Sequence, residues 1–454
     1  MKTIGGHRGL AGRVAVCCGT VLLAGACSNT PQSGGDALEA NVSEEVAAEP
    51  TVASLTEGCD DAELKTAKIG VMVPLGGSFA SDTQQVVNAA GMAAASLNEA
   101  GGVCGSDARY EFEIVEGNTN NMESSAVISA AQLLNTTDDL NFVMTSYAST
   151  SNFEIDLMSK NDMPYLMSAN SEQTQDIISK NPEKYPTIWS RVPSYEAYST
   201  ALPEVLNNLE NDGKVEFDKG KTVYIIAGSD PYGGTIAKGL KASFAENGWD
   251  VIAYDEVPTG EVTNWQTTLT RIKQDVPDVI VNTDSTAPDA AAFTNQFAAS
   301  PTDSLVFLQY APSIPQYLEL TGDTGNGVLY NMLGGAIPTL ESTKEITAEY
   351  TDKFGVPGYF AVVAYNQVML YAHCVNKVGD PTDRLAIGRC FGDLHIMTPS
   401  GPLRFDQETH LALQGGEYMP ILFHQIQSGQ RELFSPEEYA STEFTTPPWT
   451  DGGS

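Results

Sequence analysis

Short apolar runs alternate with longer stretches of helical periodicity along most of the chain. Ile69–Val73 is apolar, and after a loop with proline and glycines the apolar positions repeat at helical spacing to about Ala100. Further strands are predicted at Tyr110–Glu116, Phe142–Thr145, Tyr165–Met167, Val223–Ala227, Val251–Val257, Val279–Asn282, Leu305–Gln309 and Val328–Leu333. Further helices are predicted at Ser124–Leu134, Phe153–Ser159, Thr235–Asn247, Trp265–Lys273, Ala290–Phe297, Lys344–Lys353 and Phe360–Val378. This alternation is typical of α/β layers with parallel sheets.

The order of these elements predicts two similar α/β halves. The segment "IWSRVPSYEAY" carries the chain from one set of strand–helix units into a second set. A third section begins at about Val328 and returns to complete the first half. Its end, from about Asp393 to Leu433, is rich in β-forming residues, and "GPLRFD" and "ILFHQIQSGQREL" are expected to form a hairpin-like pair.

The loops that follow the predicted strands are short and rich in hydroxyl side chains. They are "GGSFAS", "SYASTS", "SANS", "GSDPYGG" and "TDST". Ligands of open α/β sheets bind outside the carboxyl ends of the strands, where such loops lie. Two halves that present these loops to each other would form a cleft, and the segments that connect them would act as hinges.

The amino terminus has the composition of a targeting segment. Three basic residues and no acid precede or flank Val14–Ala26, which is apolar but too short to span a bilayer as an ordinary helix. The following "LLAGAC" resembles a bacterial lipoprotein cleavage site, with alanine where leucine is usual. The resemblance implies a signal peptide at residues 1–26 and a lipidated Cys27. Cleavage elsewhere, which would release the protein, is the alternative.

Composition adds a tether and a strongly acidic body. Residues 27–66 are rich in Ser, Gly, Ala, Pro and Glu without an apolar period, which predicts a flexible acidic tether. The formal net charge of the whole chain is −34, and a surface this acidic repels nucleic acid and anionic lipid. The length of 454 residues fits two or three domains.

Four cysteines lie in the body, at Cys59, Cys104, Cys374 and Cys390. An even number in an exported chain indicates disulfides. Three pairings are possible, and we favour Cys59–Cys104 with Cys374–Cys390 because each pair flanks an element that would otherwise fray. The wide spacing and the lack of a nearby histidine cluster argue against a zinc site.

No familiar catalytic motif is present. The loop after Ile69–Val73 lacks the GxxxxGK[ST] continuation of a phosphate-binding loop, and GxSxG, HExxH, CxxC and calcium-loop patterns are missing. The chain has only five histidines, of which His373 and His424 fall in apolar runs and are expected to be packed. We therefore expect neither enzyme activity nor a cofactor or metal; an exported enzyme that uses carboxylates in the cleft is the alternative that remains.

Four segments resemble, in their order and spacing, type I periplasmic binding proteins of the branched-chain amino acid (Leu/Ile/Val) group. They are "AKIGVMVPLGGSFASDTQQVVNAAGMAAASLNEAGGV", "SYASTSNFEIDLMSKNDMPYLMSANS", "SDPYGGTIAKGLKASFAENG" and "GPLRFD". The resemblance implies two Rossmann-like lobes joined by three crossovers, with a ligand cleft between them. It places the first lobe at 67–191 plus 328–375, the second at 192–327 plus 376–440, and a loose tail at 441–454.

The resemblance also implies a function. Similar proteins are extracytoplasmic receptors of ABC importers, which bind a small solute and deliver it to membrane permease and ATPase subunits. We expect a monomer anchored by lipid to the outer face of the cytoplasmic membrane, with no nucleic-acid partner. A ligand sensor on the same fold, signalling to a membrane partner other than a transporter, is the alternative.

Ligand-binding positions follow from the resemblance, first in the first lobe. Ser149, with Tyr147 before it, matches a hydroxyl that meets the ligand carboxylate in amino acid-binding relatives, and hydroxyls suit a carboxylate because they donate without a buried counter-charge. The other implied positions are Ser78, Phe79, Asp82, Ser168, Asn170 and Ser171. Structural roles are the alternatives: a helix cap for Ser149, a turn at residues 168–171, and a first-turn acid that favours the helix dipole for Asp82.

In the second lobe, the resemblance implies Tyr232, which would close over the ligand, with Asp284, Thr286 and Tyr310. Amino acid-binding relatives usually place an acid after the strand that corresponds to Leu305–Gln309, to pair with the ligand ammonium. Here the loop is "YAPS". Either Asp284 or Asp82 takes that role, because a buried ammonium needs a paired charge, or the ligand is an amide, a urea-like compound, or an aliphatic or aromatic acid.

Overall fold

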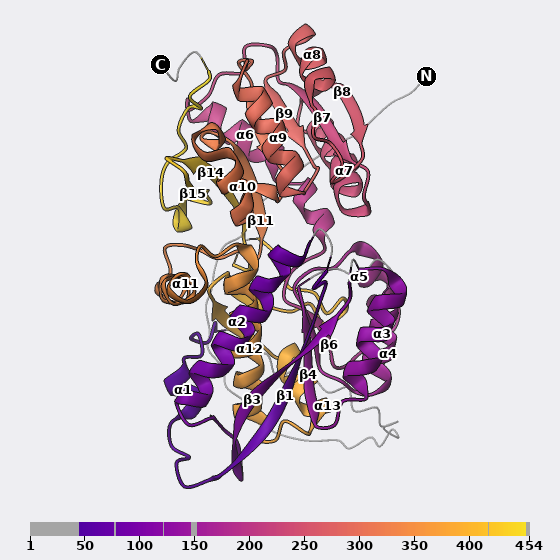
Figure 1. Cartoon of the computed structure of the whole chain (residues 1–454), viewed down its shortest axis with the longest axis vertical. Coiled ribbons are helices and arrows are strands. Elements are labelled where there is room, and N and C mark those ends of the chain that lie inside the picture. Colours follow the sequence, from indigo (N-terminus) through magenta and orange to yellow (C-terminus); the bar gives the residue numbers. More distant parts are fainter. Residues whose placement is uncertain (1–44, 77–78, 121, 147–151, 416, 451–454) are drawn as a thin grey trace, which may run out of the picture. The chain divides into compact units, whose positions relative to one another are not determined.

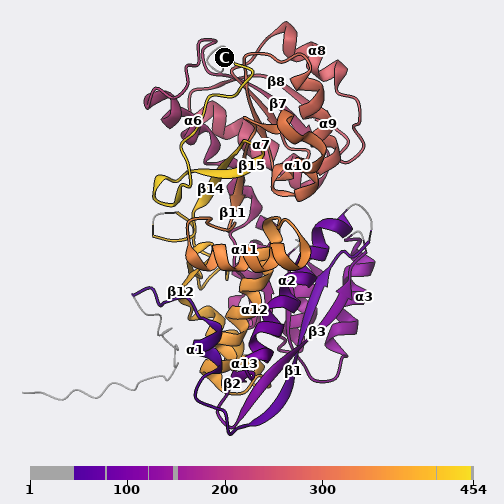
Figure 2. The same cartoon turned by 60° about the vertical axis from the view of Figure 1, so that its left-hand side comes forward.

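The computed structural model describes residues 45–76, 79–120, 122–146, 152–415 and 417–450. Within these ranges the strands form two mainly parallel sheets flanked by helices, and a separate two-stranded ribbon (Figure 1; Figure 2). The predicted α/β fold with two lobes is confirmed.

The first lobe contains a sheet with the strand order β2-β3-β1-β4-β5-β6. Its strands are β1 (Glu63–Val73), β2 (Val103–Cys104), β3 (Ala108–Asn118), β4 (Leu140–Thr145), β5 (Tyr165–Met167) and β6 (Ile188–Ser190). Neighbouring strands are parallel except for the short β2, which is antiparallel to β3. Every residue of β4 is buried, as expected for a strand that is covered on both faces.

Helices cover both faces of this sheet. On one face α2 (Ala80–Glu99) and α12 (Tyr359–Val378) lie side by side (Figure 1; Figure 2), and Ile69 and Val71 of β1 pack against them. On the other face lie α3 (Ser124–Asn135) and α4 (Phe153–Lys160), which pack against Met72. Successive residues of β1 thus serve opposite faces, as the pleat of a strand requires. The lobe also holds α1 (Val52–Thr56), α5 (Glu172–Ser179), α11 (Glu341–Phe354) and α13 (Arg384–Gly392).

The second lobe contains a sheet with the strand order β15-β14-β11-β10-β9-β7-β8. Its strands are β7 (Thr222–Gly228), β8 (Asp250–Val257), β9 (Val279–Asn282), β10 (Leu305–Leu308), β11 (Leu329–Leu333), β14 (Ile421–Gln427) and β15 (Gln430–Ser435). One face packs against α6 (Leu202–Asn211) and α7 (Pro231–Glu246), and the other against α8 (Gln266–Gln274), α9 (Ala287–Ala298) and α10 (Pro315–Thr321). The strands that precede β14 run parallel, and β14 and β15 are antiparallel additions at one edge.

The chain passes between the lobes after β6, after β11 and before β14. The fully buried guanidinium of Arg191, next to β6, donates from Nη2 to Ser400 Oγ at 2.8 Å, and Ser400 Oγ donates to the carbonyl of Gly334 at 2.8 Å. Gly334, directly after β11, has a φ of +61°, and a Cβ there would lie 2.7 Å from Val192 Cγ1. A residue with a side chain would not fit here, so glycine allows the crossing after β11 to pack closely against the crossing after β6.

Two predicted lobe assignments are wrong. β11, which begins the segment 328–375 assigned to the first lobe, pairs with β10 and β14 in the sheet of the second lobe. Conversely, α13 and β12 (His395–Thr398), within the segment 376–440 assigned to the second lobe, bury Phe391 and Ile396 in the first lobe's core. The lobe that an apolar segment joins depends on long-range packing, which its local periodicity does not specify.

The predicted pairing of "GPLRFD" with "ILFHQIQSGQREL" is also wrong. β13 (Gly401–Arg404) pairs with β12, whereas β14 forms a hairpin with β15 inside the second segment. The two residues between β14 and β15, Ser428 and Gly429, have φ values of 50° and 73°. Positive φ at both central positions is the geometry of the tight hairpin turn that matches strand twist.

The predicted tether and tail contain ordered structure. Residues 45–66, expected to be flexible, include α1, a bridge from Ala47 to Ile396, and the start of β1. In the expected loose tail, the Trp449 ring packs on Phe297 and its Nε1 donates to the carbonyl of Ser304 at 2.9 Å. Both segments are polar in composition yet gain contacts from distant parts of the fold.

The structure has the two disulfides that we favoured. Cys59–Cys104 ties the segment after α1 to β2, and Cys374–Cys390 ties α12 to α13. The lipidation site predicted at Cys27 lies outside the described residues. In the described part of the chain, we find no helix that combines the length and the apolar character needed to cross a membrane.

Candidate functional site

A cavity of about 430 Å³ lies between the carboxyl ends of the strands of the two lobes. From the first lobe, Phe79 follows β1, Ser146 follows β4, and Ser168 follows β5. From the second lobe, Tyr232 lies in the loop and helix after β7, and Tyr310 follows β10. The cavity is therefore where ligands of open α/β sheets bind, and its volume is in the usual range for small-molecule sites.

Aromatic side chains form much of the cavity wall. They are Phe79, Tyr195, Tyr198, Tyr232, Tyr310, Tyr359 and Phe360. Several rings touch one another edge to face: the centroids of Tyr195 and Tyr232 are 5.3 Å apart, those of Tyr232 and Tyr310 6.4 Å, and those of Tyr310 and Tyr359 6.3 Å. Such contacts hold the rings in fixed orientations. Burial raises the pKa of Tyr359 to about 12, so its hydroxyl stays protonated at neutral pH.

The loop after β5 gives the wall a polar patch. Asn170 Nδ2 donates to Ser190 Oγ at 2.6 Å and to the carbonyl of Val192 at 3.0 Å, which ties the loop to the first crossover. Ser171 is the N-cap of α5 and forms a capping box with Thr174. In contrast, Ser168 Oγ and Asn170 Oδ1 are buried without a hydrogen-bond partner in the described structure. Unpaired buried polar atoms are costly and mark a place for a ligand or water.

Asp230, on the second-lobe side of the cavity, acts as the N-cap of α7. Its Oδ1 accepts from the backbone N–H groups of Tyr232 and Gly233, both at 3.0 Å. Its Oδ2 accepts from Thr259 Oγ1 at 2.6 Å. The carboxylate therefore fixes the start of α7 and with it the position of the Tyr232 ring. Gln309 Nε2 donates to the hydroxyl of Tyr232 at 3.1 Å, which holds the other end of that side chain.

Asp82 bridges the lobes instead of lining the described cavity wall. It lies in the first turn of α2 and is 5% exposed. The hydroxyl of Tyr310, from the second lobe, donates to Asp82 Oδ2 at 2.6 Å. A second bridge is nearby, where Arg431 of β15 donates from Nη1 to the carbonyl of Pro357, before α12, at 2.9 Å. These bonds hold the lobes together around the cavity.

Asp284 and Thr286, both predicted from the resemblance, are outside the described lining, although Ser285 between them is part of it. Asp284 Oδ1 accepts from the backbone N–H of Thr286 at 3.2 Å and from its hydroxyl at 2.9 Å. Burial, with the carboxyl of Asp289 nearby, raises the pKa of Asp284 to about 7. The sequence thus identified the right loop, but Asp284 is turned into the lobe.

The other predicted positions divide into two groups. Phe79, Ser168, Asn170, Ser171, Tyr232 and Tyr310 line the cavity together. Ser78, Tyr147 and Ser149 lie outside the described residues. The lining residues that the sequence reasoning missed include the acid Asp230 and four aromatic residues, Tyr195, Tyr198, Tyr359 and Phe360. The signal available for Tyr195 and Tyr198 was their place directly after the predicted crossover in "IWSRVPSYEAY".

The described residues contain no cluster of three or more histidine, cysteine, aspartate or glutamate side chains that could hold a metal ion. What the cavity offers is a set of fixed aromatic rings, a few hydroxyls and one unpaired amide oxygen. This arrangement is suited to holding a small molecule by shape and hydrogen bonding.

Comparison with known proteins identifies the same family as the resemblance in the sequence. The sequence model of a periplasmic binding protein family matches residues 66–427, which is most of the chain. A search among curated proteins found no match.

Solved structures of similar fold cover nearly all of the described body. A Silicibacter pomeroyi protein assigned to branched-chain amino acid ABC transporters is 25% identical, with a TM-score of 0.76 over 85% of this chain and 100% of its own. A Streptococcus pneumoniae branched-chain amino acid substrate-binding protein in complex with isoleucine is 18% identical, with a TM-score of 0.65 over 81% and 98%. A solute-binding protein of an ABC transporter from R. palustris in complex with benzoate is 14% identical, with a TM-score of 0.66 over 86% of this chain and 99% of its own.

The family match and the two-lobed fold agree with the resemblance seen in the sequence, and the chain belongs to the periplasmic binding protein family.

Proposed function

We propose that this protein is the extracytoplasmic solute receptor of an ABC importer, and that it binds a small polar solute in the interlobe cavity, namely an amino acid, an amide or a small carboxylate. The observation that carries the proposal is the cavity itself, whose wall combines residues from the carboxyl ends of both sheets. The family consists of solute-binding proteins, and relatives of the same fold hold isoleucine or benzoate. A permease and an ATPase subunit would be the membrane partners.

Binding would work by hinge closure. The ligand would contact both lobes only when they approach, so it shifts the equilibrium toward the closed state by its extra contacts there. The Tyr310–Asp82 and Arg431–Pro357 bonds would form on closure and break on opening. The buried position of Asp82 and the place of Tyr310 in the cavity lining support this coupling.

A binding screen tests the receptor role. We expect that one or a few solutes from a panel of amino acids, amides and small carboxylates raise the melting temperature of the complete chain, since a ligand specific for the folded state stabilises it by mass action. Deletion of the gene should abolish uptake of the same solute. Binding without any loss of uptake would favour the alternative, a sensor on the same fold.

The membrane anchor is a separate part of the proposal. Lipidation of Cys27 would hold the body at the outer face of the cytoplasmic membrane. Replacement Cys27→Ser should abolish incorporation of labelled fatty acid and move the protein from the membrane fraction to the soluble fraction. Retention of the label in that variant would contradict the proposed site.

A further inference from the structure

We propose that the solute of this receptor is an aromatic carboxylic acid or its amide, without an ammonium group. The inference rests on the proposed function and narrows it to one chemical class. Three independent features of the cavity support it: the aromatic wall, the engagement of its carboxylates, and the unpaired polar atoms of the loop after β5.

The aromatic wall favours a ligand with a flat apolar body. The rings that touch one another, Tyr195, Tyr232, Tyr310, Tyr359 and Phe360, come from both lobes and form a connected series. Rings fixed in this way present faces and edges on which an aromatic ligand can pack in offset or edge-to-face geometry. A cavity of about 430 Å³ has room for one such ring with a short side chain.

The acid of the described lining, Asp230, and the acid of the lobe bridge, Asp82, are already engaged, which disfavours a ligand ammonium. The third nearby acid, Asp284, lies outside the described lining and is held by Thr286. Asp230, the one acid of the described lining, accepts three hydrogen bonds and lies at the positive end of α7. Asp82 accepts a hydrogen bond from Tyr310 and is in the field of the Arg431 guanidinium. Residues 77–78, 121 and 147–151 include no Asp or Glu in the sequence, so they supply no further acid. A buried ammonium without a paired charge is strongly unfavourable.

The unpaired polar atoms suit a carboxyl or carboxamide head. Ser168, 3% exposed, has a hydroxyl that can donate to a ligand oxygen, and Asn170, 1% exposed, has a side-chain oxygen that can accept from a ligand N–H. No Lys, Arg or His is part of the described lining, so a carboxylate head would be bound by hydroxyls rather than by a cation. A carboxylate would use the donor alone, whereas an amide would use both atoms.

Matched ligand pairs test each feature with the complete chain in mild detergent. L-Phenylalanine and 3-phenylpropanoate differ only in the ammonium group; 3-phenylpropanoate and 4-methylpentanoate differ in the ring; 3-phenylpropanoate and 3-phenylpropanamide differ in the head. We expect calorimetry to show that 3-phenylpropanoate or its amide binds at least tenfold more tightly than phenylalanine and than 4-methylpentanoate. The tighter of the two heads identifies which form is recognised.

Equal or tighter binding of phenylalanine or leucine would overturn the inference but leave the receptor function standing. Tight binding of choline or glycine betaine would also overturn it, because a cage of aromatic rings can hold a quaternary ammonium without an acid. Failure of every solute in the broad panel would instead refute the proposed function.

The variant Asp230→Asn tests whether Asp230 only caps α7 or also pairs with a positive charge on the ligand. Asparagine caps a helix about as well as aspartate, so the fold of α7 should be kept while the charge is removed. If the ligand is an acid without an ammonium, loss of this negative charge should tighten binding by about threefold to tenfold, since like charges repel. A loss of binding of tenfold or more would show that Asp230 pairs with a ligand cation and would contradict the inference.

Discussion

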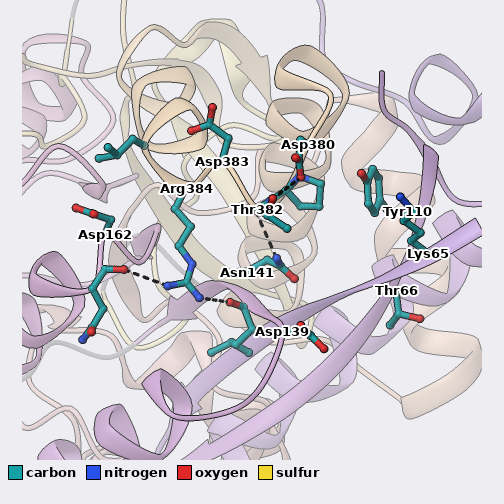
Figure 3. A pocket seen from close by; sticks show the side chains of 14 residues that line it. Lys65, Thr66, Tyr110, Asp139, Asn141, Asp162, Asp380, Thr382, Asp383 and Arg384 are labelled. Atoms are coloured by element: carbon teal, nitrogen blue, oxygen red, sulfur yellow. Dashed lines mark hydrogen bonds between the residues drawn. The ribbon is translucent and has the colours of Figure 1, made fainter. Parts of the chain in front are cut away.

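The two ends of the first lobe's sheet carry hollows of opposite character. At the carboxyl ends of β1, β4 and β5 is the aromatic interlobe cavity of about 430 Å³. At their amino ends is a larger hollow of about 750 Å³, lined by charged residues that include Lys65, Asp139 and Arg384 (Figure 3). By size and charge alone, the second hollow would be the better candidate for a polar ligand.

Hydrogen bonding reverses that choice. In the larger hollow, Arg384 donates to the backbone carbonyls of Leu140 at 2.6 Å and Asn161 at 3.0 Å, as Figure 3 shows. Asp380 Oδ1 accepts from Thr382 N and Oγ1, both at 2.8 Å, and Asp383 caps α13 through Ala386 N–H at 3.1 Å. Arg384 thus connects α13 to the sheet, and the two carboxylates are engaged in local hydrogen bonds. In the interlobe cavity, polar atoms of Ser168 and Asn170 have no partner in the described structure.

The comparison indicates that a binding site is recognised by buried polar atoms that still lack a hydrogen-bond partner. Volume and charge are poorer guides, because charged groups can be fully used in holding the fold together. The same contrast holds for the second lobe, where Asp284 at the carboxyl end of β9 has a buried Oδ2 without a hydrogen-bond partner in the described residues. Of the described residues that line the two hollows, only those of the interlobe cavity include buried polar atoms without a hydrogen-bond partner, which is costly unless a ligand or water satisfies them.

The largest effect is expected from Asp284→Asn. Burial raises the pKa of Asp284 to about 7 from 3.8, so the folded chain keeps a proton that the unfolded chain has lost. Stability therefore falls as pH rises between these values and stays low above about pH 7. Asparagine does not titrate and therefore removes this pH dependence. At about 1.4 kcal/mol per pKa unit, the free energy of unfolding at pH 8 should rise by at most about 4 kcal/mol. Urea unfolding of both proteins from pH 5 to pH 8 measures it.

The control for Asp284→Asn is Asp380→Asn in the opposite hollow, where the side chain is exposed and its hydrogen bonds are local. An equally large rise in the free energy of unfolding at pH 8 in this control would contradict the proposed difference between the carboxyl and amino ends of the sheets.

Tyr232→Ala should weaken ligand binding by roughly tenfold to a hundredfold, because it removes an aromatic ring that packs against others in the cavity wall. Calorimetry with the best solute from the screen measures the change. Tyr232→Phe keeps the ring and serves as the matched control, with a loss limited to the hydroxyl contact to Gln309. An unchanged affinity for Tyr232→Ala would place the ligand elsewhere.

Arg384→Ala should give the opposite pattern, with reduced stability and unchanged ligand affinity. It leaves the carbonyls of Leu140 and Asn161 without their donor, at a cost of about 1–2 kcal/mol. Urea unfolding measures the stability and calorimetry the affinity. A tenfold loss of affinity at full stability would identify the larger hollow as a binding site.

Ser168→Ala should have the smallest effect. Its Oγ has no partner in the described structure, so we expect a loss of stability below about 0.5 kcal/mol and a fall in affinity of about threefold to tenfold, the worth of one hydrogen bond to the ligand. Ser168→Thr, which keeps the hydroxyl, is the comparison variant. A stability loss without any change in affinity would mean that Ser168 serves the fold alone.

Much of the fold could be predicted from sequence because its strands are short apolar runs followed by amphipathic helices. The strands at Tyr165–Met167 and Val279–Asn282 have the predicted bounds. The helix α13 was missed, since Arg384–Gly392 begins directly after a polar loop and is only nine residues long. The lobe joined by β11 was assigned wrongly, since a five-residue apolar strand fits either sheet equally well.

The candidate site was predictable only where a loop directly follows a strand. Ser168 and Tyr310 are such cases, and both line the cavity. Tyr359 and Phe360 were missed because they begin a helix that follows α11 in the chain, and only the fold brings them to the cavity. Asp284 has the right position in sequence, but its hydrogen bonds to Thr286 turn it away from the described lining.

The most direct test of the receptor function is one thermal-shift screen run in parallel on the wild-type chain, Tyr232→Ala and Arg384→Ala. If the ligand binds in the interlobe cavity, at least one solute should raise the melting temperature of the wild type and of Arg384→Ala, but not that of Tyr232→Ala. Stabilisation that persists in Tyr232→Ala and disappears in Arg384→Ala would contradict it, and would move the ligand to the opposite end of the sheet.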